Sequence, residues 1–199
     1  DPDGWEGDYE AKDRVHGTAM ASLILHGDLG AAGQPLSRKI YVRPIMRPNP
    51  ASLGQRRSEE TPEGVLLIDL VHRAVKRMFE GDGNAPAAAP TVKVINLSVG
   101  NCHRIFTREI SPWARLIDWL SVKYAVLFMV SCGNDPSNLT LAIKRDTLRT
   151  MKPEGQQSSA LKALWRSSAL RRLMSPAESM NALSVGVLHT DASTPPLIP

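Results

Sequence analysis

The chain has 199 residues, of which 42% are hydrophobic and 22% are charged, and its formal net charge is +4. These values are ordinary for a globular protein and exclude a disordered or fibrous chain, and the length fits one domain. No apolar stretch reaches the roughly 18 residues that a membrane span needs, so no membrane partner is expected.

In chain order, the first half predicts two helices separated by a strand. Apolar spacing predicts a helix over 16–29, and a β-branched, apolar run predicts a strand over 39–46. A second helix is expected over 62–80, with Thr61 as its N-cap and Gly81 at its end.

The second half predicts alternating strands and helices. A buried strand over 91–100 precedes a helix over 112–123 that Ser111 caps, and a second buried strand follows over 124–133. The later predicted elements are helices over 139–151 and 158–174 and a strand over 182–188. This alternation, with strands that are apolar on both faces, indicates a parallel sheet covered by helices on each side. Four strand residues are expected to pack in the core: Val94, Ile95, Leu127 and Phe128.

Positive charge is concentrated in one segment. Residues 139–175 hold eight Lys or Arg against Asp146 and Glu154, a local net charge of +6. A basic surface can attract nucleic acid, but Trp165 is the only aromatic residue there, so a solvated helical face is favoured over nucleic-acid binding. We expect one domain over residues 1–199 with a basic helical insertion over 136–180, which could dock another domain or partner.

Neither the cysteines nor the histidines have the spacing of a metal site. Cys102 and Cys132 form no CxxC pattern, and two free thiols are favoured over a single bridge, which stays open. His16 and His26 are not at helical i+3 or i+4 spacing, and no HExxH motif is present. No metal and no cofactor is expected.

Ligands of parallel α/β sheets sit beyond the carboxyl ends of the strands, which directs attention to the strand exits. Two exits are rich in polar and glycine residues, "NLSVGN" over 96–101 and "VSCGND" over 130–135. A third candidate is "HGTAMAS" over 16–22, in which a histidine opens a helix. The absence of GxGxxG and GK[ST] patterns argues against an unrelated nucleotide-binding domain.

Four motifs together resemble the subtilisin-like serine proteases (the subtilases, peptidase family S8). "HGTAMAS" is similar to the family's histidine motif, "VINLSVG" to its substrate-binding strand and "SCGN" to the strand that ends in the oxyanion-hole asparagine. "SPAESMNALSVGV" is similar to the stretch before the family's serine motif. The resemblance implies a three-layer α/β fold with a mostly parallel twisted sheet and helices on both faces, truncated at both ends.

The resemblance also implies roles for seven residues. His16 would be the general base and then the general acid, because histidine titrates near neutrality. Asn134 would donate a hydrogen bond to the oxyanion. The substrate-binding residues would be Ser98, Val99 and Gly100, which pair with an extended peptide, and Ser131 and Gly133 in the wall of the primary specificity pocket. Gly17 would allow close packing at the start of the histidine helix.

The family's aspartate and serine motifs are not recognisable, because no apolar strand ending in Asp precedes His16 and no Gly-Thr-Ser-Met-Ala stretch occurs. We therefore expect an internal piece of a catalytic domain that is inactive alone, whose partners are a polypeptide substrate and the missing portions of its own domain. The parent would be a serine endopeptidase of bacterial type, soluble, and either secreted or cytoplasmic. A pseudoprotease or peptide-binding module of the same fold is the alternative.

Overall fold

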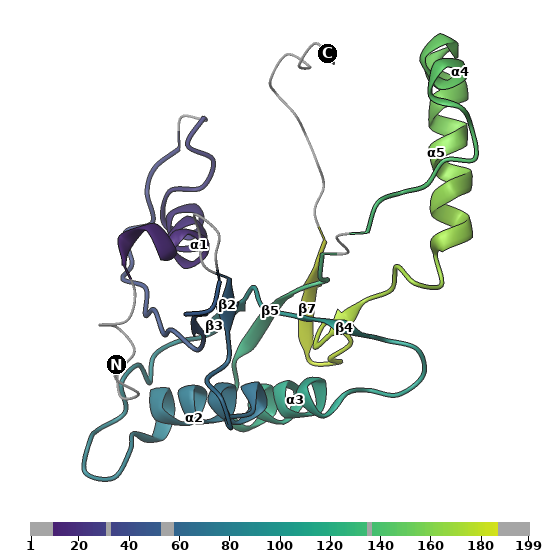
Figure 1. The fold of residues 1–199 in the computed structure, drawn as a ribbon. Helices are drawn as coiled ribbons and strands as arrows, with labels where there is room; N and C mark the ends of the chain where they lie inside the picture. Colours follow the sequence, from purple (N-terminus) through teal and green to yellow (C-terminus); the bar gives the residue numbers. More distant parts are fainter. Residues whose placement is uncertain (1–9, 31–32, 53–57, 135–136, 187–199) are drawn as a thin grey trace. The chain divides into compact units, whose positions relative to one another are not determined.

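A computed structural model describes residues 10–30, 33–52, 58–134 and 137–186 (Figure 1). The chain divides into two compact units, residues 1–93 and residues 94–199, and each unit is described by itself. The prediction of a single domain over the whole chain stays a prediction.

The first unit begins with a short 3-10 helix, Ala11–Asp13, followed by helix α1, Val15–His26. Gly27 ends α1 with a φ of 67° that glycine tolerates, and its N–H bonds to the Leu23 carbonyl oxygen. The helix predicted over 16–29 is therefore confirmed, although it is shorter and none of its residues is buried.

The strand predicted over 39–46 is wrong. This segment is irregular, and the nearest strand is β1, Arg47–Pro48, which pairs antiparallel with β2, Glu59–Glu60. The apolar side chains that suggested a strand are exposed at Tyr41 and Val42, and no described strand pairs with them. An apolar, β-branched sequence is not enough for a strand, which also needs a neighbouring strand with which to hydrogen-bond.

Helix α2, Leu67–Glu80, is the amphipathic helix of the first unit. Its buried face is formed by Leu70, Val71, Ala74, Val75 and Met78. Gly81 ends it with a φ of 81°, as expected, but Thr61 is not its N-cap. The reason is Gly64, whose φ of 74° is left-handed and incompatible with a helix that starts at Pro62.

The second unit contains a three-stranded sheet of order β3-β5-β7, with both pairings parallel. The strands are β3, Val94–Leu97, β5, Leu127–Ser131, and β7, Ala182–Val185. Helix α3, Pro112–Tyr124, lies in the crossover between β3 and β5 and contacts β5 and β7. The predicted parallel α/β arrangement is confirmed (Figure 1).

The two faces of this sheet differ in burial. Phe128 and Val130 of β5 are fully buried on one face, as are Ile117 and Leu120 of α3. On the other face, Val94 is 52% exposed and Leu127 is 42% exposed. Core packing was expected for both, and that expectation is wrong, whereas it is confirmed for Phe128; Ile95 is half-buried.

The connection from β5 to β7 contains two helices and a strand. Helix α4 is Arg145–Thr150 and helix α5 is Pro153–Ser167, so the two predicted helices exist with shifted bounds. Strand β6, Met174–Ser175, pairs antiparallel with β4, Asn101–Ile105, and neither strand was predicted. The peptide bond between Ser175 and Pro176 is cis. No helix within the described ranges has the length and apolar character to cross a membrane.

Candidate active site

The two predicted substrate-binding segments leave neighbouring strands of the second unit. Ser98–Gly100 follows β3, and 132–134 follows β5, whose last residue is Ser131. Leu97 and Val130 are paired in the parallel register, so both segments leave the sheet at the same edge. The structure thus brings together six of the seven predicted site residues: Ser98, Val99, Gly100, Ser131, Gly133 and Asn134.

The exit of β5 is fixed by two hydrogen bonds, one to a backbone carbonyl oxygen and one to a side-chain hydroxyl. The Cys132 N–H donates to the Val185 carbonyl oxygen over 3.0 Å, and the Gly133 N–H donates to the Ser131 Oγ over 3.2 Å. Gly133 has a φ of 96°, a conformation that favours glycine. The turn delivers Asn134 to an exposed position, where its carboxamide is accessible.

Strand β6 lies between these two exits and was missed by sequence reasoning. The Met174 N–H donates to the Cys132 carbonyl oxygen over 3.1 Å. A Cβ placed on Gly100 would lie 3.5 Å from the Ser175 carbonyl oxygen, so β6 also borders the exit of β3. The motif "SPAESMNALSVGV" begins at Ser175 and could have pointed here, but helical spacing assigned Met174 to the preceding helix.

Side-chain hydrogen bonds hold the chain after β6 onto helix α3. The Ser111 Oγ and Ser175 Oγ are 2.6 Å apart, and the Ser111 N–H donates to Glu178 Oε1 over 3.0 Å. At the other end of this segment, Asp118 Oδ1 accepts from the Ser179 hydroxyl over 2.5 Å and from the Asn181 N–H over 2.7 Å. These anchors fix β6 beside the strand exits.

His16 lies in the first unit, at the second residue of α1. His16 is exposed, and Arg14, the N-cap residue of α1, makes no side-chain capping hydrogen bond. A Cβ added to Gly17 would meet no atom within 4 Å, so the close packing expected there is absent from the described structure. The catalytic roles of His16 and Asn134 stay predictions, since the two residues belong to different units.

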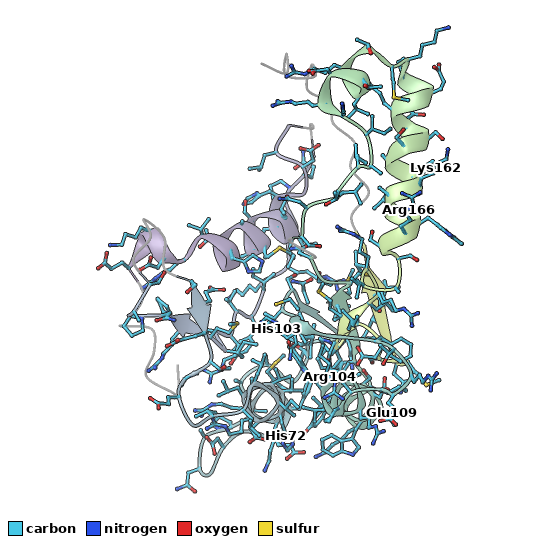
Figure 2. All side chains as sticks on the ribbon, turned by 45° about the vertical axis from the view of Figure 1, so that its right-hand side comes forward. His72, His103, Arg104, Glu109, Lys162 and Arg166 are labelled. Atoms are coloured by element: carbon cyan, nitrogen blue, oxygen red, sulfur yellow. The ribbon has the colours of Figure 1, made fainter. Side chains whose placement is uncertain are left out.

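Other polar residues in the described ranges do not assemble a metal site. Figure 2 shows His72 on α2 and His103 on β4. Among the residues that the structure describes, no three His, Cys, Asp or Glu side chains are grouped as metal ligands would be. Cys102 and Cys132 are both free, which is the alternative that was favoured over a single bridge.

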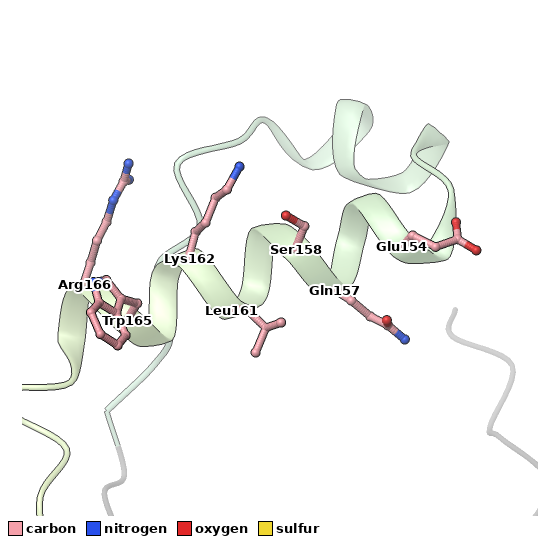
Figure 3. Close-up of a pocket in the computed structure, with 7 residues that line it drawn as sticks. All are labelled: Glu154, Gln157, Ser158, Leu161, Lys162, Trp165 and Arg166. Atoms are coloured by element: carbon pink, nitrogen blue, oxygen red, sulfur yellow. The ribbon is translucent and has the colours of Figure 1, made fainter.

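A shallow hollow lies apart from the strand exits, along helix α5 (Figure 3). Trp165 in this hollow is 81% exposed, and the cationic side chains of Lys162 and Arg166 flank it. In the whole of α5 only Ala163 is buried. Helix α5 therefore exposes most of its surface, and the interpretation of the basic segment as a solvated helical face stays a prediction.

The comparison with known families agrees with the geometry of the second unit. A family model described as the subtilase family matches residues 2–195. The chain belongs to the subtilase family. No curated protein and no solved structure shows a significant match. The fold is therefore a subtilisin-like α/β fold, and the chemistry of the family is that of serine peptidases. The resemblance predicted from the four sequence motifs is confirmed.

Proposed function

We propose that the full-length protein containing this subtilase chain is a serine endopeptidase that cleaves polypeptides through an acyl-enzyme. The observation that carries the proposal is the common edge at which Ser98–Gly100 and Ser131–Asn134 leave two paired parallel strands. An extended substrate peptide needs backbone groups to which it can hydrogen-bond beside the scissile bond. The oxyanion that forms there needs a hydrogen-bond donor. This edge offers both.

The proposal gives His16 the proton transfers. It would accept the proton of the nucleophilic serine and return it to the leaving amine. Its place at the exposed start of α1 supports this role, because an imidazole that exchanges protons with substrate has to be accessible. We assign neither the nucleophilic serine nor the orienting aspartate to a residue of this chain, and we propose that the chain alone does not hydrolyse peptides.

Asn134 would stabilise the tetrahedral intermediate. Its carboxamide N–H is a neutral donor that needs no proton transfer of its own, and the bonded turn from Ser131 to Gly133 holds the backbone that carries it. A preorganised donor acts where charge develops in the transition state and pays no reorganisation cost at that moment.

Labelling with a fluorophosphonate probe tests the proposal, because the probe reacts only with an activated serine. We expect the full-length protein to be labelled, its His16→Ala variant to be labelled far more slowly, and the 199-residue chain to be unlabelled. Circular dichroism should verify that each sample is folded. Labelling of the 199-residue chain, or no labelling of the folded full-length protein, would contradict the proposal.

The alternative function is peptide binding without hydrolysis. It is supported by the same strand edge, because Ser98–Gly100 could pair with an extended peptide whether or not a nucleophile is present. A folded full-length protein that resists the probe but binds peptides, with binding weakened by Gly100→Val, would establish this alternative in place of the peptidase.

A further inference from the structure

The first unit contains a basic pocket, formed by helix α2, the turn that follows it and the irregular segment before β1. Four cationic side chains line it: Arg73, Lys76 and Arg77 of α2, and Arg43 of the irregular segment. Its volume is about 460 Å³, within the range of small-molecule sites. The other lining residues are two carboxylates and two glycines, so none of the described lining residues has an apolar or aromatic side chain. A ligand in this pocket would be held by charge and hydrogen bonds.

The cations on α2 converge because of the amphipathic pattern of the helix. Arg73, Lys76 and Arg77 stand at positions i, i+3 and i+4, so their side chains leave neighbouring points of one helix face. Like charges at this spacing repel one another. Arg43 adds a further positive charge from a different segment of the chain. An anion in the pocket would relieve the repulsion among all four groups.

Two carboxylates offset this positive charge only in part. The Arg77 Nη1 and Asp82 Oδ2 atoms form an ion pair of 2.8 Å, and the side chain of Asp82 is 67% exposed. An exposed ion pair of this kind is weak, so an incoming anion can compete with Asp82 for Arg77. The second carboxylate, Glu80, leaves the pocket with an excess of positive charge over the four cationic groups.

The C-terminus of α2 opposes an anion less than an uncapped helix end would. The last carbonyl groups of a helix carry a partial negative charge. In α2 the Arg77 and Met78 carbonyl oxygens accept from the Ala88 and Ala89 N–H groups over 3.1 and 3.0 Å. Gly81 permits this return of the chain, because its φ is 81° and a Cβ there would collide with the backbone that follows.

We propose that the basic pocket binds a small soluble ligand that carries at least two phosphate groups. Three of its four cations are arginines, whose planar guanidinium groups bind two phosphate oxygens at a time. A single phosphate is much smaller than the cavity, whereas a diphosphate or triphosphate can reach α2 and Arg43 together. A nucleobase is not expected as part of the ligand, since no aromatic side chain among the described lining residues could stack on it. This site does not depend on the proposed peptidase function.

Isothermal titration calorimetry of the full-length protein tests the proposal with three probes. These are tripolyphosphate, inorganic phosphate and a hexaglutamate peptide, which offers carboxylates in place of phosphates. We expect tripolyphosphate to bind with a Kd below about 1 mM and at least about tenfold more tightly than inorganic phosphate, because it engages more of the cations. Hexaglutamate should bind more weakly than tripolyphosphate, since its carboxylates are spread along a chain of several residues.

Variants locate the binding and give it a sign. Lys76 is exposed, so Lys76→Gln should leave the buried face of α2 intact and weaken tripolyphosphate binding by about tenfold or more. Arg73→Lys keeps the charge but loses the paired donors and should weaken binding by a smaller factor. Asp82→Asn should strengthen binding, because it removes the carboxylate that competes for Arg77. The matched control is Lys162→Gln, which removes an exposed lysine from α5 and should leave the Kd unchanged.

Circular dichroism should verify that each variant is folded. Weaker binding by Lys76→Gln together with tighter binding by Asp82→Asn supports the proposal. An unchanged Kd for Lys76→Gln, or an equal loss in Lys162→Gln, overturns it, since binding would then lie elsewhere or reflect general attraction to a basic protein. Absence of tripolyphosphate binding by the folded protein also overturns it. Tighter binding of hexaglutamate than of tripolyphosphate overturns the assignment to phosphate and indicates an acidic polypeptide as the ligand.

Discussion

The Oγ atoms of Ser111 and Ser175 share a buried hydrogen bond of 2.6 Å, which ties the start of helix α3 to strand β6. Ser111 also caps α3, because its Oγ accepts from the Ala114 N–H over 3.1 Å. One hydroxyl therefore serves both a helix terminus and the strand that borders the proposed site.

Replacement of Ser111 by alanine should remove both interactions at once. We expect Ser111→Ala to lower the free energy of unfolding by about 1–3 kcal/mol, because an N-cap is lost and the Ser175 hydroxyl is left buried without its partner. Urea denaturation followed by circular dichroism measures this. Ser158→Ala, at an exposed position of α5, is the control and should change stability little. Equal stability of the two variants would refute the prediction.

The two faces of β5 should respond differently to truncation. Phe128 is fully buried, whereas the adjacent Leu127 is 42% exposed. We expect Phe128→Ala to cost about 3–5 kcal/mol in unfolding free energy, and Leu127→Ala to cost less than about 1.5 kcal/mol. Chemical denaturation of both variants under one set of conditions gives the comparison. A larger loss for Leu127→Ala would mean that the exposed face is covered in solution.

A methyl group at Gly133 should be destabilising for two reasons that can be separated. Gly133→Ala introduces a side chain at a φ of 96° and a collision with Met174. In the background of Met174→Ala the collision is largely relieved and the backbone strain remains. We therefore expect Gly133→Ala to lower the free energy of unfolding less in the Met174→Ala background than in the wild type. The difference, measured by a double-mutant cycle, should be about 0.5–3 kcal/mol. Additive costs would show that the two residues do not touch.

Loss of Asn134 should slow catalysis by the full-length protein without weakening substrate binding to the same degree. We expect Asn134→Ala to reduce kcat by about 100- to 1000-fold, the magnitude established for an oxyanion-hole asparagine of a subtilisin. KM should change far less, because the hydrogen bond forms chiefly in the transition state. Steady-state kinetics on one peptide measures both constants. A raised KM with unchanged kcat would instead indicate ground-state binding.

The helical part of the β5 to β7 connection should be dispensable for the fold of the second unit. Only Ala163 is buried in α5 and no residue is buried in α4. We expect replacement of residues 140–169 by a short Gly-Ser linker to shift Tm by no more than about 4 °C. The design keeps Arg171, whose guanidinium donates to the Ser137 carbonyl oxygen over 3.0 Å and joins the two ends of the segment. Loss of cooperative thermal unfolding would show that these helices support the sheet.

Local signals in the sequence predicted local structure well. Ser111 followed by Pro112 predicted the start of α3, since both the cap and the fixed φ of proline act within one turn. Gly81 likewise predicted the end of α2. The start of α2 was misplaced because Thr61 and Pro62 carry the same local signal, and only the backbone of Gly64 reveals that a turn comes first.

Features that depend on distant partners were not predictable in the same way. Strands β4 and β6 pair although most of the sequence of the second unit lies between them. Neither Asn101–Ile105 nor Met174–Ser175 alternates between apolar and polar residues. The strand exits of the candidate site were found because their glycines and polar residues form motifs. Met174 carries no such pattern, and only the structure shows that it occupies the space that a Cβ on Gly133 would take.

The bond between the Met174 N–H and the Cys132 carbonyl oxygen closes the base of a long excursion of the chain. The chain leaves the sheet after Cys132 and returns to it at Met174, so the part of this excursion that follows Asn134 can be regarded as an insertion. Evolution could lengthen, shorten or replace this insertion without changing which strands pair. New regulatory or recognition elements can thus be acquired there while the proposed site at the strand exits is preserved.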